Sequence, residues 1–380
     1  MSVATRSAIL PLHVRLDAPA DLTGAGVTMA FLDAGFYAHP DLCAPRDRIL
    51  HYVDINDRRA RRLDLDVPDA SSWHGMMTSV VACGNGHLSG GRYRGLASAA
   101  DLVLVRCGRV TRITHDDIRR GLDWVLAHRA RFNIRIVNIS CGGDYEASYL
   151  TDALSQSAEA LARDGVFVCA AVGNAGHQPG HPVVPPASAP SVLAVGGLDD
   201  KNDLADHDWA LYHSSYGPTI DGLQKPEVIA PGIWVAAPIL PGTPTAAQAT
   251  LLEHLDQAPA ASLRDLIVRN PGVDAALDAA AHLEPPLIRQ LVEARLRDHN
   301  VISGSYKHVD GTSFASPIVA SLAAQMIEAN PALTPQAIRH ILIRTARRLP
   351  AVAIDQQGWG IVQPRRAVDQ ARAWQPAVAQ

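Results

Sequence analysis

Residues 311–317 read Gly-Thr-Ser-Phe-Ala-Ser-Pro, a stretch that places a serine between a glycine and the start of an apolar helix. A serine hydroxyl is a weak nucleophile at neutral pH. Ser313 therefore needs a base to take its proton and a carboxylate to orient that base. If residues 311–317 present a nucleophile, other segments of the chain must supply both groups.

Candidates for the base and the carboxylate lie upstream. Asp33 ends the apolar run 27–32 and precedes Ala-Gly, which is typical of a buried strand that delivers a carboxylate at its carboxyl end. His74 precedes small and apolar residues at 75–82, a pattern that predicts a histidine in the first turn of a buried helix. The chain order of the three groups is Asp, His, Ser.

A fourth motif is Ala-Ala-Val-Gly-Asn-Ala-Gly at 170–176, where an apolar strand runs into an amide flanked by glycines. The side chain of Asn174 can donate a hydrogen bond to an oxygen that becomes negative during a reaction. Each residue alone has an ordinary explanation: Asp33 as a turn former, His74 as a helix-start residue, Ser313 as an N-cap. Those explanations leave the coincidence of four motifs unaccounted for.

Strands and helices alternate along most of the chain. Apolar runs predict strands at 27–32, 102–106, 134–139, 166–171 and 192–195, and helical patterns occur at 75–83, 116–131, 148–163 and 314–329. We therefore expect an α/β fold with a doubly wound, mainly parallel sheet and helices on both faces, which binds ligands at the carboxyl ends of the strands. Residues after about 365 are expected to form a weakly fixed tail.

Composition limits the class of protein. A chain of 380 residues that is 47% hydrophobic can bury a large core, enough for one large domain and a smaller unit. The net charge of −4 and the scattered basic residues argue against nucleic-acid binding. No apolar run reaches about 18 residues and no signal-peptide core is present, so we expect a cytoplasmic protein without a membrane partner. The five widely spaced cysteines fit a reducing compartment and lack metal-ligand spacing.

In their order and spacing, these motifs resemble the subtilisin-like serine proteases, the subtilase family. The matching segments are 27–42, 74–82, 137–143, 168–176 and 311–317, with further matches at 214–218 and 225–232. The resemblance implies a subtilisin-like fold and a serine endopeptidase, expected here as a dedicated processing protease. Its implied catalytic residues are Asp33, His74 and Ser313, with Asn174 and the Ser313 N–H forming the oxyanion hole.

The resemblance also implies where a peptide or protein substrate binds. Ser140, Cys141 and Gly142 would hold the acyl side of the substrate backbone as an added strand and form one wall of the main specificity pocket. Ala171 to Gly173 would form the facing wall of that pocket.

The opposite edge of the substrate channel is implied to lie at 109–113, which includes Thr111 and Arg112. Val184 stands where many subtilases have a glycine at the floor of the main pocket. A branched side chain there implies a preference for small or medium apolar residues. His74 is followed by Gly-Met-Met in place of the family's usual Gly-Thr-His, a departure that leaves the base itself unchanged.

No cofactor is expected for this chemistry. Many subtilases bind structural calcium, and Asp41 matches one of their calcium ligands. The loop at 84–91 has no carboxylates, however, so a tight calcium site is not expected there.

Residues 243–302 break the alternating pattern, because they are rich in Ala, Leu and charged residues and are punctuated by prolines. We expect a small helical insertion there, near the leaving-group side of the cleft by resemblance. Residues 1–242 and 303–380 then form the peptidase domain. Two roles stay open for the insertion: a stabilising surface addition, or a lid or docking site for a partner or leader peptide.

Two alternatives to hydrolysis also stay open. In a transpeptidase or macrocyclase, an amine in place of water would take the acyl group. A non-catalytic binding module of the same fold is the other alternative. Loss of one of the four motif residues would have favoured that module, and none of them is lost.

Overall fold

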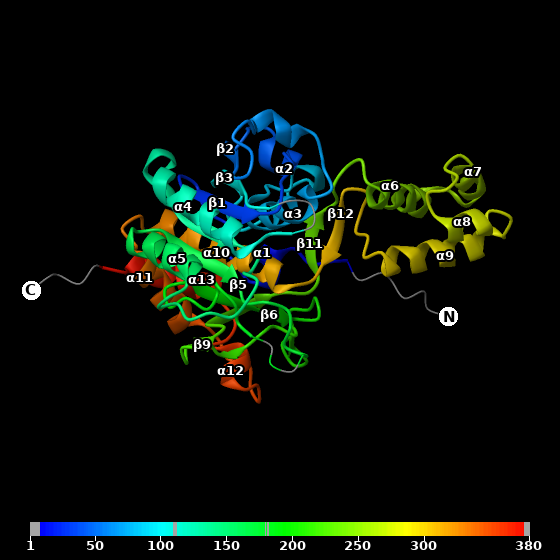
Figure 1. Cartoon of the computed structure of the whole chain (residues 1–380). Coiled ribbons are helices and arrows are strands. Elements are labelled where there is room, and N and C mark those ends of the chain that lie inside the picture. Colours follow the sequence, from blue (N-terminus) through cyan, green and yellow to red (C-terminus); the bar gives the residue numbers. More distant parts are fainter. Residues whose placement is uncertain (1–7, 109–111, 179, 181, 376–380) are drawn as a thin grey trace, which may run out of the picture. The chain divides into compact units, whose positions relative to one another are not determined.

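A computed structural model describes residues 8–108, 112–178, 180 and 182–375 (Figure 1). The chain divides into two compact units. Among the described residues, the larger unit comprises residues 10–235 and 310–375, and the smaller unit comprises residues 236–309 together with residues 8 and 9.

The larger unit is built on one central sheet. Its strands are β1 (Thr28–Asp33), β2 (Ile49–Asp54), β3 (Asp101–Arg106), β4 (Ile134–Ile139), β5 (Phe167–Ala171), β6 (Leu193–Asp199), β7 (Ala210–Leu211) and β10 (Val228–Pro231). The strand order is β10-β6-β5-β4-β1-β3-β2, and all of these neighbours are parallel. The short strand β7 pairs antiparallel with β6, and β8 (Gly217–Pro218) pairs antiparallel with β9 (Gln224–Lys225).

Helices cover both faces of this sheet (Figure 1). The α-helices of the larger unit are α1 (Leu12–Arg15), α2 (Pro40–Cys43), α3 (Ser72–Cys83), α4 (His115–Phe132), α5 (Ala153–Arg163), α10 (Thr312–Ala329), α11 (Pro335–Thr345), α12 (Ile354–Gln357) and α13 (Pro364–Ala373). Short 3₁₀ turns lie at Arg62–Asp66 and His87–Ser89.

Residues of β1 alternate between the two faces, because successive side chains of a strand point to opposite sides. Ala30 and Leu32 pack in the core cluster formed with α4 and α5. Met29 contacts Cys83 of α3, with 3.6 Å between the two sulfurs, on the other face. All six residues of β1 are buried, as expected for a strand inside a parallel sheet covered on both sides. The expected α/β fold with a doubly wound, mainly parallel sheet is confirmed.

The expectation of a loose tail after residue 365 is wrong. Residues 364–373 form α13, whose Ala367, Val368 and Ala371 are fully buried. Asn330 at the end of α10 fixes this segment, because its side-chain amide donates to the carbonyl oxygens of Ala371 at 2.9 Å and Trp374 at 3.0 Å.

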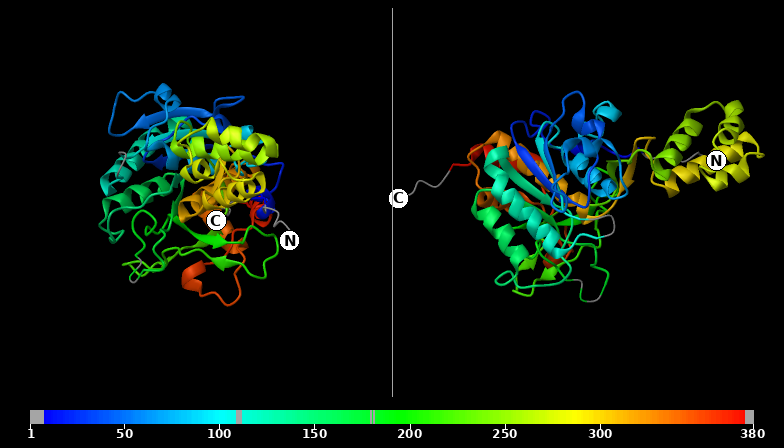
Figure 2. Two further views of the ribbon diagram at one scale, coloured as in Figure 1. Left: turned by 90° about the vertical axis from the view of Figure 1, so that its right-hand side faces the viewer. Right: turned by 45° about the horizontal axis from the view of Figure 1, so that its top comes forward.

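The smaller unit is mostly helical (Figure 2). It contains α6 (Pro244–Gln257), a 3₁₀ turn at Ala260–Ser262, α7 (Leu263–Val268), α8 (Ala275–Ala280) and α9 (Pro285–Asp298), with strands β11 (Val235–Pro238) and β12 (Tyr306–Val309) paired at its two ends. Leu252, Leu255, Leu263 and Leu277 are fully buried in its own core. The unit is therefore wider than the 243–302 segment that the sequence pattern marks, because it includes residues 236–238 of β11 and all of β12.

Across the described ranges, no helix is both long enough and apolar enough to span a bilayer.

Candidate active site

Asp33 and His74 form a close pair at the carboxyl end of β1. The Nδ1 atom of His74 lies 2.8 Å and 3.0 Å from the two carboxylate oxygens of Asp33. Asp33 is 1% exposed, and its carboxylate also accepts the N–H of Ala34 at 2.8 Å. A buried carboxylate in this position selects the imidazole tautomer that carries its proton on Nδ1 and leaves Nε2 as the proton acceptor.

The glycine after His74 allows α3 to approach the end of β1 this closely. A Cβ atom at Gly75 would lie 2.2 Å from the carbonyl oxygen of Gly35 and 2.9 Å from the Cβ of Asp33. The His-Gly pair of the sequence motif is thus a requirement of packing as well as of chemistry.

The pKa of His74 reflects two opposing effects. Burial lowers the pKa of this imidazole, but the charge of Asp33 and its hydrogen bond outweigh burial and raise the pKa above 6.5. The protonated imidazole that would form during proton transfer is therefore stabilised by its partner.

Ser313 lies in the first turn of α10, close to His74. The ring of Phe314, the next residue, is 5.9 Å from the ring of His74. The Ser313 hydroxyl donates to the carbonyl oxygen of Ser140 at 3.1 Å. Among the hydrogen bonds of the described residues there is none between His74 and Ser313, so the structure brings the two residues into one region without joining them directly.

A hydrogen-bond network fixes the start of α10 against the end of β4. The Ser140 hydroxyl donates to the carbonyl oxygen of Ser313 at 2.8 Å, and Asn138 donates to the Ser140 hydroxyl at 3.0 Å. The Ser316 hydroxyl, one turn further along α10, donates to Asn138 at 2.8 Å. Ser313 is therefore held on a rigid support, and the residue is only partly buried.

Asn174 is exposed, and its side-chain orientation is fixed by Thr312. The oxygen Oδ1 accepts the Thr312 N–H at 2.9 Å and the Thr312 hydroxyl at 2.8 Å. Its amide nitrogen is left to donate, and this atom lies 3.7 Å from where a Cβ on Gly311 would stand. Sequence reasoning did not identify Thr312 as a positioning residue, although its place next to Ser313 was a signal for it.

The residues of the two predicted walls of the specificity pocket contact neighbouring segments of the larger unit. A Cβ on Gly142 would lie 2.9 Å from Cγ2 of Val184, so this branched side chain packs directly on the Gly142 backbone. Ala171 ends β5 and is partly buried. Gly173 has a φ of 108°, a conformation that favours glycine, and its carbonyl oxygen accepts the Ser215 N–H at 2.9 Å.

The other predicted substrate-binding residues lie in different surroundings. Arg112 is exposed and pairs with Asp144 at 3.0 Å. Thr111 lies outside the described residues. Cys141 is partly buried, and burial together with the charge of Asp33 raises the pKa of its thiol well above 9.0. A thiolate nucleophile is therefore disfavoured beside Ser313.

The polar groups of Asp41 contact other groups of the protein. Its buried carboxylate accepts the Leu88 N–H at 3.0 Å, and its carbonyl oxygen accepts a 2.7 Å hydrogen bond from the guanidinium of Arg48. Arg48 is itself buried and also donates to the carbonyl oxygens of Cys83 and Ala100 at 2.6 and 2.9 Å. Carbonyl oxygens that face a buried cation of the protein are not free to ligate a metal cation.

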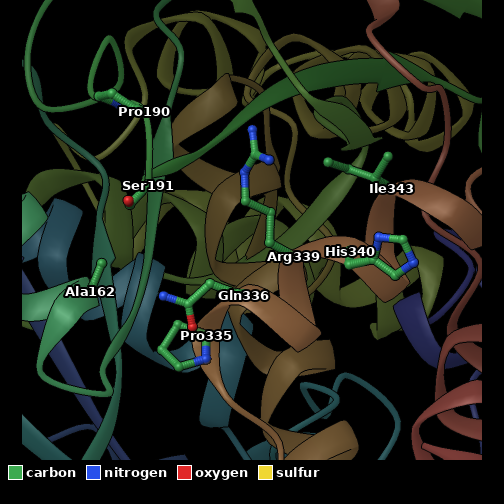
Figure 3. Close-up of a pocket in the computed structure, with 8 residues that line it drawn as sticks. All are labelled: Ala162, Pro190, Ser191, Pro335, Gln336, Arg339, His340 and Ile343. Atoms are coloured by element: carbon green, nitrogen blue, oxygen red, sulfur yellow. The ribbon is translucent and has the colours of Figure 1, made fainter. Parts of the chain in front are cut away.

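A separate hollow of about 250 Å³ lies between the end of α5 and α11 (Figure 3). It is lined by Ala162, Pro190, Ser191, Pro335, Gln336, Arg339, His340 and Ile343, none of which is a predicted site residue. Arg339 is already paired with Glu227 at 2.7 Å, and the buried Lys225 pairs with the same carboxylate. This hollow therefore has no part in the arrangement around Ser313.

The model of the subtilase family matches residues 24–360 of this chain. The chain belongs to the subtilase family. The enzyme class expected from the sequence, a subtilisin-like serine endopeptidase, is confirmed as the class of this family.

Curated relatives of this subtilase are named as proteases. Serine protease AprX of Bacillus subtilis (strain 168) is 28% identical over 329 residues, which cover 84% of this chain and 61% of AprX. The minor extracellular protease Epr of the same organism is 29% identical over 198 residues, 51% of this chain and 27% of Epr. Subtilisin BL of Lederbergia lenta is 28% identical over 227 residues, covering 58% of this chain and 70% of that protein. The chain thus spans less than two thirds of the length of AprX and of Epr.

Solved structures share the fold. A protease from Pseudoalteromonas arctica PAMC 21717 matches with a TM-score of 0.61 at 22% identity, covering 97% of this chain and 96% of the other. Fervidolysin from Fervidobacterium pennivorans, described as a keratinolytic enzyme related to subtilisin, gives 0.60 at 20% identity, with 92% and 43% covered. The protease domain of PatA gives 0.58 at 20% identity, with 93% and 98% covered.

Proposed function

We propose that this subtilase is a serine endopeptidase that cleaves peptide bonds through an acyl-enzyme formed on Ser313. The observation that carries the proposal is the Asp33–His74 pair, 2.8 Å apart, placed beside the turn of α10 that holds Ser313. Membership of a serine protease family supports the same conclusion.

In the proposed mechanism, the Ser313 hydroxyl leaves the carbonyl of Ser140 and transfers its proton to Nε2 of His74 as its oxygen attacks the substrate carbonyl. Asp33 stabilises the imidazolium through the Nδ1–H. The bond between the acyl carbon and the amide nitrogen then breaks, and His74 returns the proton to the leaving amine. Water, deprotonated by His74, attacks the ester in turn, and the proton returns to Ser313.

We assign stabilisation of the anionic oxygen to the Asn174 amide and the Ser313 N–H. We expect Asn174→Ala to lower kcat by about 10²–10³-fold with little change in KM, the range established for the oxyanion amide of subtilisin, a member of this family. The reason is that the amide acts on charge present only in the transition state. Steady-state kinetics on a peptide anilide measures the effects on kcat and on KM separately. A rise in KM at constant kcat would instead assign Asn174 to ground-state binding.

We propose a preference for small or medium apolar residues on the acyl side of the scissile bond. Its support is the contact of Val184 with Gly142, which takes up volume where the pocket is expected to be open. To test this preference, kcat/KM is measured for peptide anilides that differ only in the residue on the acyl side of the scissile bond, which is Ala, Leu, Phe or Lys. The highest value is expected within Ala to Leu.

Hydrolysis and amine transfer give different products from one peptide. Hydrolysis adds the mass of one water across the two fragments, whereas transfer to an amine joins the acyl fragment to that amine. Mass spectrometry of a cleaved peptide, with and without a second peptide amine in excess, decides between them. We expect hydrolysis fragments in both samples, and ligated or cyclic product as the main species would support the transferase.

We propose that catalysis needs no bound metal, since proton transfer and anion stabilisation are both assigned to side chains. Running these assays in excess EDTA tests this directly: kcat/KM is expected to stay unchanged.

We also propose that the helices within 243–302 restrict access to particular substrates or bind a partner or leader peptide. The support is that they have a core of their own, of which Leu252, Leu255 and Leu277 are fully buried members. A chain in which 243–302 is replaced by a short linker, compared with the full chain on a short peptide and on a folded protein, tests this role. Equal rates of the two chains on both substrates would leave only a stabilising role.

A further inference from the structure

We propose that His115 is a positioning residue for the acyl side of the substrate, acting through the backbone at Gly143. The inference rests on the proposed function, in which residues 140–142 bind the substrate backbone. His115 is the first residue of α4.

The His115 ring is anchored on one side to the start of α5. Its Nε2 donates to Oδ1 of Asp152 at 2.6 Å, and the two side chains are 11% and 4% exposed. The other oxygen of Asp152 accepts the Ser155 N–H at 2.6 Å, which makes Asp152 the N-cap of α5. The carboxylate is therefore fixed by the helix, and it fixes the ring in turn.

The other edge of the ring lies directly against Gly143. A Cβ at Gly143 would lie 2.4 Å from Nδ1 and 3.1 Å from Cε1 of His115. The Gly143 N–H donates to the carbonyl oxygen of Pro185 at 2.7 Å, next to Val184 of the predicted pocket floor. The ring of Tyr145 stacks on the imidazole at 4.5 Å with an interplanar angle of 11°.

The backbone of His115 adds a second link between the two predicted edges of the substrate channel. Its N–H donates to Oδ2 of Asp144 at 2.9 Å, and the guanidinium of Arg112 donates to Oδ1 of the same carboxylate at 3.0 Å. The hydrogen bond from the His115 backbone, followed by the one from Arg112, lowers the pKa of Asp144, so this carboxylate stays charged as both contacts form.

Hydrogen bonds alone do not explain why a histidine occupies position 115. The flat shape of its imidazole ring does. The Nδ1 atom of His115 is buried and has no hydrogen-bond partner among the described residues. A buried polar atom without a partner is costly, so a flat ring wedged between α5 and Gly143 needs another reason to be there. Holding the 140–143 backbone at a fixed distance from α4 and α5 supplies that reason.

Such positioning affects long substrates more than short ones. An added strand depends on backbone hydrogen bonds along several residues, and a misplacement of about 1 Å can cost two orders of magnitude in rate. A substrate with one acyl-side residue contacts mainly Ser313, His74 and Asn174. The ratio of kcat/KM for long and short substrates therefore reports on the segments that hold the acyl side of the substrate, the 140–143 backbone among them.

The test compares a tetrapeptide anilide with a single-residue ester that carries the same residue at the scissile bond. Active enzyme is counted by fluorophosphonate titration. We expect His115→Ala to lower kcat/KM about tenfold for the tetrapeptide, mainly through KM, and to change the ester by less than about twofold. His115→Gln, which keeps a terminal donor for Asp152, should restore part of the loss. His128→Ala, on the same helix, is the matched control and should leave both substrates unchanged.

An equal loss for both substrates, or no loss for either, would overturn the inference. If His115→Ala fails to fold, Asp144→Ala removes the acceptor shared by Arg112 and the His115 N–H, and the same shift in ratio is expected at about threefold. A wild-type protein that neither reacts with the fluorophosphonate nor cleaves the ester would instead overturn the proposed function, and this inference with it.

Discussion

Replacing Ser313 by alanine should lower kcat for peptide hydrolysis by about 10⁶-fold, the scale known for the nucleophile of subtilisin, a member of this family. The loss is expected because no other group can take its place: Cys141 is the neighbouring nucleophile, and burial holds its thiol in the neutral form. Within the described part of the chain, the removed hydroxyl makes one hydrogen bond, to the carbonyl of Ser140. Stability should therefore change by no more than about 1 kcal/mol.

A matched control for this variant is Ser321→Ala, in the same helix. Ser321 is fully buried and donates within α10, to the carbonyl oxygen of Ile318 at 2.7 Å. Its removal should leave kcat within about twofold. A Ser313→Ala protein that keeps more than about a hundredth of the wild-type kcat, while its melting temperature is unchanged, would contradict the assignment of the nucleophile.

Replacing Asp33 by asparagine should lower kcat by about 10⁴-fold near neutral pH. The amide no longer selects the tautomer with its proton on Nδ1, and it no longer stabilises the imidazolium formed during proton transfer. The variant also loses a charge that is 1% exposed, so the fold should survive the change. Adding Asp33→Asn to Ser313→Ala should cause little further loss, because the two residues act as a unit.

The pH profile of these enzymes gives a second readout. His74 acts as a base only when neutral, and its pKa is raised above 6.5 because the effect of Asp33 exceeds that of burial. Activity of the wild type should therefore fall as the pH drops through a value above 6.5. In Asp33→Asn, burial still lowers the pKa of His74 but the opposing charge is gone. The loss of activity at acidic pH should therefore move to lower pH. If the variant loses activity at the same acidic pH as the wild type, Asp33 does not control the protonation of His74.

The secondary structure that carries the site is predictable from the sequence because it lies in long apolar runs. β1, β4 and β5 are buried on both faces, and α3 and α10 are made of small and apolar residues, so composition alone identifies them. β2 was not predicted, because Leu50 is exposed on it and His51 interrupts its apolar residues. α5 begins at residue 153 and not at 148, since the side chain of Asp152 caps it.

Other parts of the fold depend on contacts between distant residues, which one sequence does not reveal. The buried residues of α13 are Pro364, Ala367, Val368 and Ala371, and its docking against α10 and α11 makes it a helix of the core. The orientation of Asn174 depends on Thr312, 138 residues away. The contact of His115 with Asp152 and Gly143 likewise brings the start of α4 against the loop between β4 and α5.

The sequence motifs predict that their side chains gather near the end of β1, because each motif ends a strand or begins a helix of the same sheet edge. What they did not predict is the direction of the Ser313 hydroxyl, which donates to Ser140 rather than to His74. Hydroxyl rotation is cheap, and catalytic hydrogen bonds of unliganded enzymes are often long or absent.

The central claim is that Ser313 is an activated nucleophile, and covalent labelling measures this most directly. The folded protein is treated with a fluorophosphonate probe and digested, and the modified peptide is sequenced by mass spectrometry beside the Ser313→Ala variant. We expect a single adduct on Ser313, formed faster as the pH rises through the pKa of His74, and none in the variant. No adduct on folded wild-type protein, or the same adduct in Ser313→Ala, would contradict it.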